Sequence, residues 1–148
     1  PLHPVFSIRS VVTMVKTLHG GNAVSYGRHY VTPGDQVIAT VPIGYADGYL
    51  RCMTGKASVL IHGKRAKVIG SVCLDPMDVT GIPDVKEDDS VTIVGRDGEE
   101  EITFDELAGY AGTINYELVC LIGKRVPRVY YRNGEAVGTV NYLFDGQG

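Results

Sequence analysis

Residues 58–69 read S-V-L-I-H-G-K-R-A-K-V-I, and this stretch decides the fold. Val59 and Ile61 mark an alternating pattern on its first arm, and residues 64–69 form a second arm. Between the arms stands His62-Gly63, a pair that suits the tight turn of a β-hairpin. The stretch therefore predicts two antiparallel strands.

Two more turn signals of this kind occur further along the chain. Asp97-Gly98 and Asn133-Gly134 each stand between short β-rich segments. The predicted strand segments are residues 5–18, 36–43, 58–61, 64–69, 91–94, 101–102, 129–131 and 136–142. Many short strands with regular turns are typical of a small barrel or sandwich.

Helix signals occur only between the second and third hairpins. Thr103 and Glu106 fit a capping box, which predicts a helix of about two turns ending near Gly112. Asn115 is the candidate cap of a second helix. This second helix would carry three apolar residues on one face: Leu118, Leu121 and Ile122. We therefore expect a mainly β (β-rich α+β) fold, a small antiparallel β-barrel with two short helices.

The length and composition fit one folded domain. The chain has 148 residues and a mass of 16.0 kDa, which is room for one core, so we expect residues 1–148 to form a single domain. A net charge of −3 and an isoelectric point near 5.8 supply no basic field for a phosphate backbone. We also identify no strand face that combines basic and aromatic residues. A nucleic-acid partner is therefore not expected.

Membrane, disulfide and metal roles are not expected either. The longest apolar stretch, residues 37–46, is far shorter than the ~20 residues that a membrane-spanning helix needs. Cys52, Cys73 and Cys120 are odd in number and widely spaced, which indicates reduced thiols in the cytoplasm. The histidines show no metal-ligand spacing with one another or with cysteine.

Three segments combine turn residues with groups that carry chemistry. Residues 41–49 place Tyr45 just after a buried strand, where sites often form, although a tyrosine there also suits packing on a barrel rim. Tyr116 stands at a helix start, which favours an anion such as phosphate; the alternative is an ordinary cap. In residues 70–78, the N–H groups of a turn near Cys73 suit a carboxylate, and the alternative is a small core residue. From spacing alone, each structural alternative is favoured.

Six blocks of sequence occur in an order that points to one family. They are residues 24–28 (V-S-Y-G-R), 42–49 (P-I-G-Y-A-D-G-Y), 72–75 (V-C-L-D), 82–85 (I-P-D-V), 113–117 (T-I-N-Y-E) and 123–130 (G-K-R-V-P-R-V-Y). In this order they resemble the carboxy-terminal domain of bacterial alanine racemase. The resemblance covers nearly the whole chain, and the blocks around Tyr45 and Tyr116 are highly specific.

The resemblance implies an enzyme that uses pyridoxal 5'-phosphate (PLP) to interconvert L- and D-alanine, which supplies D-alanine for bacterial peptidoglycan. Members carry an amino-terminal α/β barrel that holds the cofactor on a lysine, and they pair head to tail as homodimers. Racemisation removes a proton from one face of the α-carbon and returns it on the other, so it needs two bases and an electron sink. The resemblance makes that lysine one base and Tyr45 the other, supplied to the partner subunit's active site.

The resemblance also assigns three further residues. Tyr116 would hydrogen-bond the cofactor phosphate, whereas Cys73 and Leu74 would lie near the substrate carboxylate, with the Leu74 N–H as donor. Tyr45 and Tyr116 would narrow the entrance and limit the substrate to a small side chain. The chain departs from the family pattern at Ser71, where the family has Arg, and at Leu74, where it has Met.

The lysines of this chain lie outside the block that the family uses to attach its cofactor. We therefore expect a carboxy-terminal part of a longer, cytoplasmic two-domain enzyme, inactive without the α/β barrel that binds PLP. One alternative is a serine racemase module, because the altered turn at Ser71 would lie near the substrate. The other is a non-catalytic β-barrel interaction domain, and the presence of both Tyr45 and Tyr116 counts against it.

Overall fold

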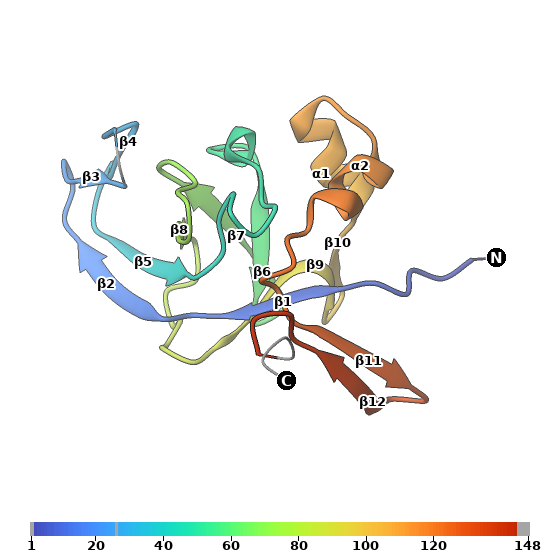
Figure 1. Cartoon of the computed structure of the whole chain (residues 1–148). Helices are drawn as coiled ribbons and strands as arrows, with labels where there is room; N and C mark the ends of the chain where they lie inside the picture. The colour runs from blue at the N-terminus through green and yellow to red at the C-terminus, as the bar shows by residue number, and fades with distance from the viewer. Residues whose placement is uncertain (1, 26, 145–148) are drawn as a thin grey trace.

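The computed structural model describes residues 2–25 and 27–144, and most of its strands form one antiparallel sheet (Figure 1). The sheet has the order β1-β9-β6-β7-β8-β5-β2, and β10 adds to β9. Its strands are β1 (Ile8–Val11), β2 (Met14–Leu18), β5 (Gln36–Val41), β6 (Ser58–Ile61), β7 (Lys64–Ile69), β8 (Met77–Thr80), β9 (Ser90–Asp97) and β10 (Glu100–Ile102). The other elements are β3 (Ala23–Val24), β4 (Tyr30–Val31), the 3-10 helix η1 (Arg51–Met53), α1 (Phe104–Ala111), α2 (Asn115–Leu121), β11 (Arg128–Arg132) and β12 (Glu135–Val140). The expected β-rich fold with two short helices is confirmed.

The two ends of this sheet are successive segments of the chain. β1 pairs with β9 and β2 pairs with β5, and only Val12 and Thr13 separate them. The Val12 N–H donates to the Asp89 carbonyl at 2.9 Å, and the Thr13 N–H donates to the Thr40 carbonyl at 2.9 Å. At these two residues the chain passes from one edge of the sheet to the other, and a hydrogen bond to each side satisfies its backbone. The strand predicted over residues 5–18 is therefore two strands.

The hairpin predicted over residues 58–69 forms the centre of the sheet as β6 and β7. Ile61 pairs with Lys64, and between them His62 and Gly63 have positive φ angles of 53° and 68°. Two successive positive φ angles are what a two-residue hairpin turn of type I′ requires. Val59, Leu60 and Ile61, which precede this turn in β6, are fully buried, so the hairpin supplies much of the core.

α1 begins and ends where the sequence predicts. The Thr103 hydroxyl accepts a hydrogen bond from the Glu106 N–H at 3.1 Å, and Gly112 ends the helix with a φ of 72°. The Glu106 carboxylate binds Arg65 at 2.7 Å instead of turning back to complete a capping box. This ion pair connects α1 to β7.

α2 begins one residue earlier than predicted. Ile114 is its cap, with extended backbone and no side-chain hydrogen bond, and Asn115 is already helical. The prediction that Asn115 caps this helix is therefore wrong. Leu118 is buried, but Leu121 is 41% exposed, so the predicted apolar face is only partly packed. Within residues 2–25 and 27–144, no helix is long and apolar enough to cross a membrane.

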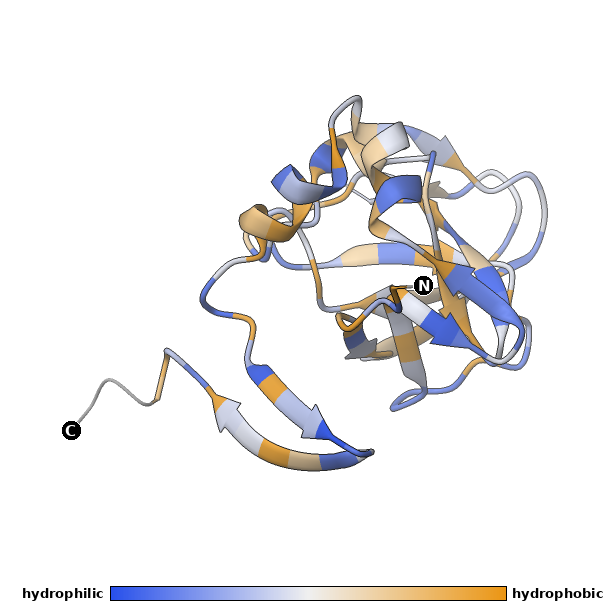
Figure 2. Ribbon diagram, turned by 90° about the vertical axis from the view of Figure 1, so that its right-hand side faces the viewer, coloured by the Kyte–Doolittle hydropathy of each residue, from blue (hydrophilic) through white to orange (hydrophobic). Residues whose placement is uncertain are grey.

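The third predicted hairpin is present but forms a sheet of its own. β11 and β12 pair around Asn133-Gly134 and project from the body of the domain (Figures 1 and 2). Tyr130 is 54% exposed, Tyr131 is 69% exposed, and Arg132 is also exposed. The chain therefore does carry an exposed strand with basic and aromatic residues, contrary to our prediction. We call β11 and β12 together the outer hairpin.

Candidate functional site

The loop that carries Tyr45 follows β5 and folds on itself through Asp47. The Asp47 carboxylate accepts a hydrogen bond from the Gly44 N–H at 3.0 Å, and the Tyr49 N–H donates to the Gly44 carbonyl at 3.1 Å. Asp47 is only 7% exposed. An acceptor buried next to this N–H fixes the turn, because an unpaired buried N–H is costly. The side chain of Tyr45 therefore starts from a rigid backbone.

The same loop lies directly against the turn that carries Cys73 and Leu74. The Tyr45 N–H donates to the Cys73 carbonyl at 3.1 Å, and the Ala46 N–H donates to the Leu74 carbonyl at 3.0 Å. A Cβ atom on Gly44 would lie 2.2 Å from the Cys73 carbonyl oxygen, so only glycine permits this approach. The structure thus brings Tyr45, Cys73 and Leu74 together, although they are distant in the sequence.

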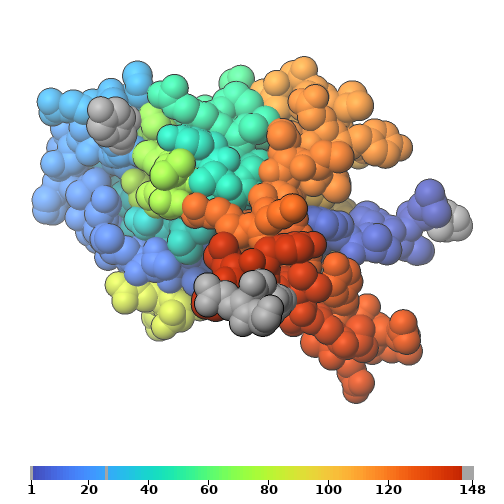
Figure 3. All heavy atoms as spheres, in the orientation of Figure 1, coloured from blue at the N-terminus to red at the C-terminus, as the bar shows by residue number. Residues whose placement is uncertain are grey.

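An arginine holds both segments from a third side. Arg125 Nε lies 2.7 Å from an Asp47 carboxylate oxygen, and its guanidinium also binds Asp75 in the Leu74 turn. The hydrogen bond with Asp75 and the two negative charges raise the pKa of Arg125. The Gly123 N–H donates to the Asp47 carbonyl at 2.9 Å. The surfaces of the Tyr45 loop, the Leu74 turn and residues 123–125 adjoin on one face of the domain (Figure 3).

Sequence reasoning missed Asp47 and Arg125 as positioning residues. Both stand inside blocks that it identified, residues 42–49 and 123–130. An aspartate three residues after Gly44 is a signal for a side-chain-to-backbone turn. No comparable signal pairs it with Arg125, because that contact depends on the fold.

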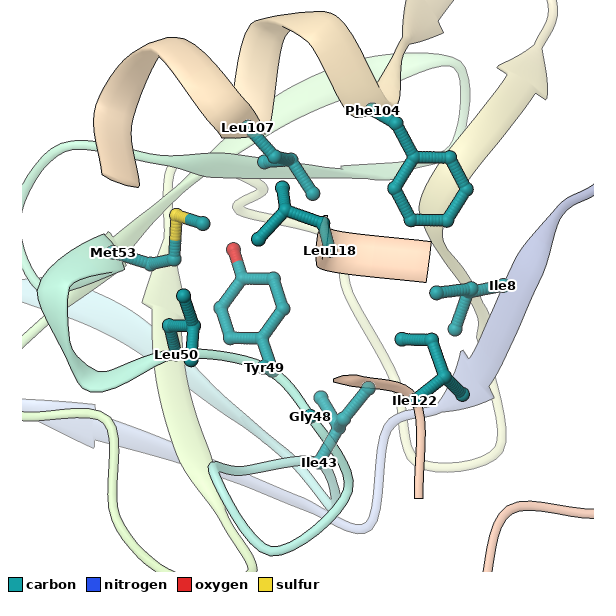
Figure 4. A pocket seen from close by; sticks show the side chains of 10 residues that line it. All are labelled: Ile8, Ile43, Gly48, Tyr49, Leu50, Met53, Phe104, Leu107, Leu118 and Ile122. Carbon is teal, nitrogen blue, oxygen red and sulfur yellow. The ribbon is translucent and has the colours of Figure 1, made fainter. Parts of the chain in front are cut away.

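Tyr49 anchors the far end of the Tyr45 loop in the core. It is 4% exposed, and its ring lies among Met53, Leu107 and Leu118 in an apolar pocket (Figure 4). Its hydroxyl is buried without a hydrogen-bond partner among the described residues. Burial raises the pKa of this phenol, and the charge of Glu106 adds to the effect. Tyr49 therefore acts as a structural anchor and is protonated near neutral pH.

The side chains assigned to chemistry lie on the surface, outside this apolar pocket. Tyr45 is 46% exposed and Leu74 is 50% exposed. Within the described part of the chain, the Leu74 N–H has no backbone acceptor. Cys73 is half-buried, and its thiol lies 3.4 Å from the Ser71 carbonyl. The exposed residues thus include a phenol and an N–H without a backbone acceptor, groups that suit proton transfer and carboxylate binding respectively.

Tyr116 lies apart from the Tyr45 loop. It is in the first turn of α2 and is 76% exposed. The Tyr45 loop meets the opposite end of α2, where a Cβ on Gly48 would lie 2.4 Å from the Leu121 carbonyl oxygen. The structure therefore groups Tyr45 with Cys73 and Leu74 and does not bring Tyr116 into this group.

Ser71, the main departure from the family pattern, is buried. It is 4% exposed, and its carbonyl accepts a hydrogen bond from the Ser25 hydroxyl at 2.9 Å. The Ser25 hydroxyl also lies 3.8 Å from the Cys73 thiol. The segment at Ser25 is therefore fastened to the same turn. Tyr26, which follows it in the sequence, lies outside the described residues.

The site is built without a metal-ligand cluster. In the part of the chain that the structure describes, no group of three or more His, Cys, Asp or Glu residues is arranged to hold a metal ion. Its polar groups are a phenol, backbone N–H groups and the ion pair of Arg125 with Asp47.

Comparisons with known proteins identify the family of the chain. The family model "Alanine racemase, C-terminal domain" matches residues 5–130. Alanine racemase 1 of Clostridium acetobutylicum is 45% identical over 144 residues, which is 96% of this chain and 37% of that protein. Alanine racemase 1 of Bacillus subtilis is 42% identical over 142 residues, 96% of this chain and 36% of that protein.

Solved structures show the same likeness in three dimensions. Alanine racemase from Bacillus anthracis with bound L-Ala-P matches with a TM-score of 0.94 at 42% identity, over 97% of this chain and 37% of that one. Alanine racemase from Clostridium difficile in complex with cycloserine has a TM-score of 0.87 at 41% identity, over 96% of this chain and 37% of that one. This chain thus spans little more than a third of these relatives, and it belongs to the alanine racemase family as a carboxy-terminal domain of that family.

Proposed function

We propose that this chain works as the carboxy-terminal domain of an alanine racemase that interconverts L- and D-alanine with PLP. The observation that carries the proposal is the junction between the Tyr45 loop and the Leu74 turn. Two backbone hydrogen bonds and the Arg125 ion pairs hold the exposed Tyr45 next to the exposed Leu74, whose N–H has no backbone acceptor among the described residues. This pair supplies a proton-transfer group and a carboxylate donor from one rigid surface.

In this proposal, the Tyr45 phenol takes the α-proton from one enantiomer and returns it to the other. A phenol with an ordinary pKa near 10 is a weak base at neutral pH, so it needs a neighbour that favours the phenolate. That neighbour must come from outside this surface, because no described side chain donates a hydrogen bond to the Tyr45 hydroxyl. An exposed phenol is suited to reach a site on another subunit, in agreement with a head-to-tail homodimer.

PLP fits the donors that this chain presents. Tyr116 extends an exposed hydroxyl from the first turn of α2 and is proposed to donate a hydrogen bond to the cofactor phosphate. When bound, PLP withdraws electrons from the substrate α-carbon, so that its proton is more easily removed. The attaching lysine is proposed to lie in the rest of the polypeptide, and the 148-residue chain alone is proposed to be inactive.

The Leu74 turn is proposed to bind the substrate carboxylate through the Leu74 N–H. Cys73 lies next to it and contributes its carbonyl to the Tyr45 loop. Tyr45 and Tyr116 would narrow the entrance and favour a substrate with a small side chain. The serine racemase alternative gains no support from Ser71, because that residue is only 4% exposed. Relative turnover of L-serine and L-alanine by the full-length protein checks this point.

A second tyrosine competes for the role of Tyr45. The Ser25 hydroxyl binds the Ser71 carbonyl at 2.9 Å, so the segment that continues into Tyr26 starts beside the Leu74 turn. The test must therefore separate these two phenols. It also needs a tyrosine whose hydroxyl serves only structure, and Tyr110, which bonds Glu106 within α1 at 3.3 Å, meets this need.

The test measures α-proton exchange in D2O, for L-alanine and D-alanine separately, by the full-length protein with PLP. Replacing the base by Phe removes proton transfer on one face, so we expect Tyr45→Phe to slow racemisation by at least about 100-fold. Exchange from one enantiomer should fall much more than exchange from the other.

The controls decide between the phenols. Tyr110→Phe should leave both exchange rates near those of the unaltered enzyme. If Tyr26→Phe abolishes exchange from one enantiomer while Tyr45→Phe keeps most of the rate, Tyr26 is the base and Tyr45 lines the entrance. A full-length protein that catalyses no exchange from either alanine would overturn the proposed function itself.

A further inference from the structure

Residues 122–127, between α2 and β11, connect the three elements that carry the residues assigned to chemistry (Figure 1). We call them the linking segment. Arg125 within this segment pairs with Asp47 in the Tyr45 loop and with Asp75 in the Leu74 turn. At its amino-terminal end the linking segment continues α2, which carries Tyr116 in its first turn. One short stretch of chain thus joins the Tyr45 loop, the Leu74 turn and α2.

The linking segment packs closely against the backbone of the Tyr45 loop. The Gly123 N–H donates to the Asp47 carbonyl at 2.9 Å, and a Cβ on Gly123 would lie 3.1 Å from the Ala46 carbonyl oxygen. On the other side of the junction, a Cβ on Gly48 would lie 2.9 Å from the Ile122 Cα. Because protein packed this tightly transmits displacement, a shift of the linking segment would move the Tyr45 loop.

Arg128, the first residue of β11, holds the shape of the linking segment. Its guanidinium donates to the Ile122 carbonyl at 2.9 Å and to the Gly123 carbonyl at 2.7 Å, and it also binds the Val126 carbonyl. Carbonyl groups at the end of a helix lack helical partners, and the fixed fork of an arginine can reach several of them at once. Ile122 is the cap residue of α2, so the same side chain also fixes the end of this helix.

The partners of Arg128 set it apart from three other arginines. Arg65, Arg96 and Arg125 each bind a carboxylate, whereas Arg128 forms no ion pair with any of the described residues. Its charge is directed at backbone carbonyls instead, and its side chain is attached to a half-buried position. Hydrogen bonds from a charged donor are stronger than those between neutral groups. The linking segment is therefore held mainly by this one residue.

We propose that Arg128 is a positioning residue for the racemase reaction. Its guanidinium holds the linking segment in the shape in which Gly123 and Arg125 bind the Tyr45 loop and the Leu74 turn. Arg128 acts through these contacts and does not touch the substrate. The inference rests on the proposed function, which gives the Tyr45 phenol and the Leu74 N–H their roles.

The first test measures racemisation by the full-length protein with PLP after Arg128→Lys. Lysine keeps the charge, but its compact ammonium does not match the three carbonyls that the planar guanidinium reaches. We expect kcat per PLP-bound subunit to fall at least about tenfold, because small displacements of reacting groups are costly. A loss of stability alone would lower the amount of folded enzyme and leave this kcat unchanged.

Arg96→Lys is the matched control. The side chain of Arg96 is 73% exposed and binds Glu101 at 3.3 Å. Exposed pairs of this kind contribute little, so kcat should stay near that of the unaltered enzyme. Gly123→Ala disturbs the junction with the Tyr45 loop and leaves Arg128 in place, so it should lower kcat as Arg128→Lys does.

A second readout is hydrogen exchange of the full-length protein, followed by mass spectrometry. In Arg128→Lys, exchange over residues 42–49 and 72–75 should become at least about tenfold faster, whereas exchange over β6 and β7 should not change. This pattern would show a local loosening of the site.

Three results would overturn the proposal: an unaltered kcat in Arg128→Lys or in Gly123→Ala, faster exchange of β6 and β7 as well, or an Arg128→Lys protein that does not fold. The last two would show that Arg128 serves the stability of the whole domain. If the unaltered full-length protein does not racemise alanine, the proposed function fails, and hydrogen exchange still decides whether Arg128 holds the Tyr45 loop.

Discussion

The Tyr45 loop and the outer hairpin are held in opposite ways. The Tyr45 loop is fixed within this chain by the buried carboxylate of Asp47, the ion pairs of Arg125 and the anchor Tyr49. The outer hairpin is held by its own ladder, and its side chains are exposed. The difference indicates that contacts within the chain fix the Tyr45 loop, whereas both faces of the outer hairpin are left uncovered by the described residues.

The largest effect, a loss of racemase activity, is expected from Gly44→Ala. The new Cβ would lie 2.2 Å from the Cys73 carbonyl oxygen and 2.5 Å from that of Leu74, so the two segments must separate. A displacement of about 1 Å at such a site costs roughly 100-fold in rate, and we expect a loss of that size in racemisation by the full-length enzyme.

Gly109→Ala is the matched control for this variant. Gly109 lies within α1, and a Cβ there meets nothing within 4 Å. Alanine in a helix interior stabilises by about 0.5–1 kcal/mol relative to glycine, so this variant should be active and slightly more stable. A Gly44→Ala enzyme as active as Gly109→Ala would show that the loop contact is not needed.

The second largest effect is a loss of stability when the carboxylate of Asp47, which accepts the Gly44 N–H, is removed. Asp47→Ala leaves the Gly44 N–H without its acceptor and removes a partner of Arg125. An orphaned buried N–H costs about 1–3 kcal/mol of unfolding free energy, which urea unfolding measures. Asp75→Asn, at an exposed position that binds the same arginine, should cost much less. Equal losses in the two variants would contradict the special role of Asp47.

A smaller effect, with the opposite sign, is expected from Tyr49→Phe. The change removes a buried hydroxyl that has no partner among the described residues, so we expect a gain of about 1 kcal/mol in unfolding free energy. Thermal unfolding at neutral pH measures this gain. A loss of stability would mean that the hydroxyl has a partner, such as a buried water.

The burial of Tyr49 also predicts how the stability of the folded protein changes at alkaline pH. Burial raises the pKa of Tyr49 in the folded protein, whereas in the unfolded chain a tyrosine titrates near pH 10. Above about pH 10 the unfolded chain releases this proton first, so stability falls as pH rises toward the raised folded pKa. Tyr49→Phe should remove this part of the alkaline loss. Unchanged pH profiles in the two proteins would contradict the burial effect.

The smallest effect should come from Tyr131→Ser in the 148-residue chain. Tyr131 is 69% exposed, so replacing it should change the unfolding free energy by less than about 0.5 kcal/mol. In the full-length protein, the same change should lower the melting temperature by several degrees if the ring is covered there. An equal effect in both proteins would remove the contrast between the Tyr45 loop and the outer hairpin.

The parts of the fold that the sequence predicts are those determined by local chemistry. The turn at His62-Gly63 and the cap at Thr103 depend on residues close in sequence, and both are confirmed. The division of residues 5–18 at Val12 and Thr13 depends on acceptors far along the chain, and it was not predicted. The exposure of the outer hairpin is not predicted for a related reason, since it depends on which elements pack against β11 and β12, and no spacing within residues 128–140 reveals this.

Prediction of the candidate site from the sequence has the same limit: it succeeds for local motifs and fails for contacts between distant segments. The blocks that contain Tyr45, Leu74 and Tyr116 are readable in the sequence, and the structure brings the first two together. The link through Arg125 joins three separate segments, so no spacing in the sequence reveals it. Positions of single motifs are thus predictable here, whereas the contacts that make them rigid are not.

The most direct test of the account compares racemisation of L-alanine with PLP by the full-length protein and by the 148-residue chain. The account predicts that the full-length protein interconverts L- and D-alanine and that the 148-residue chain alone does not. Racemisation by the 148-residue chain, or its absence in the full-length protein, would contradict the claim that this domain supplies part of a composite active site.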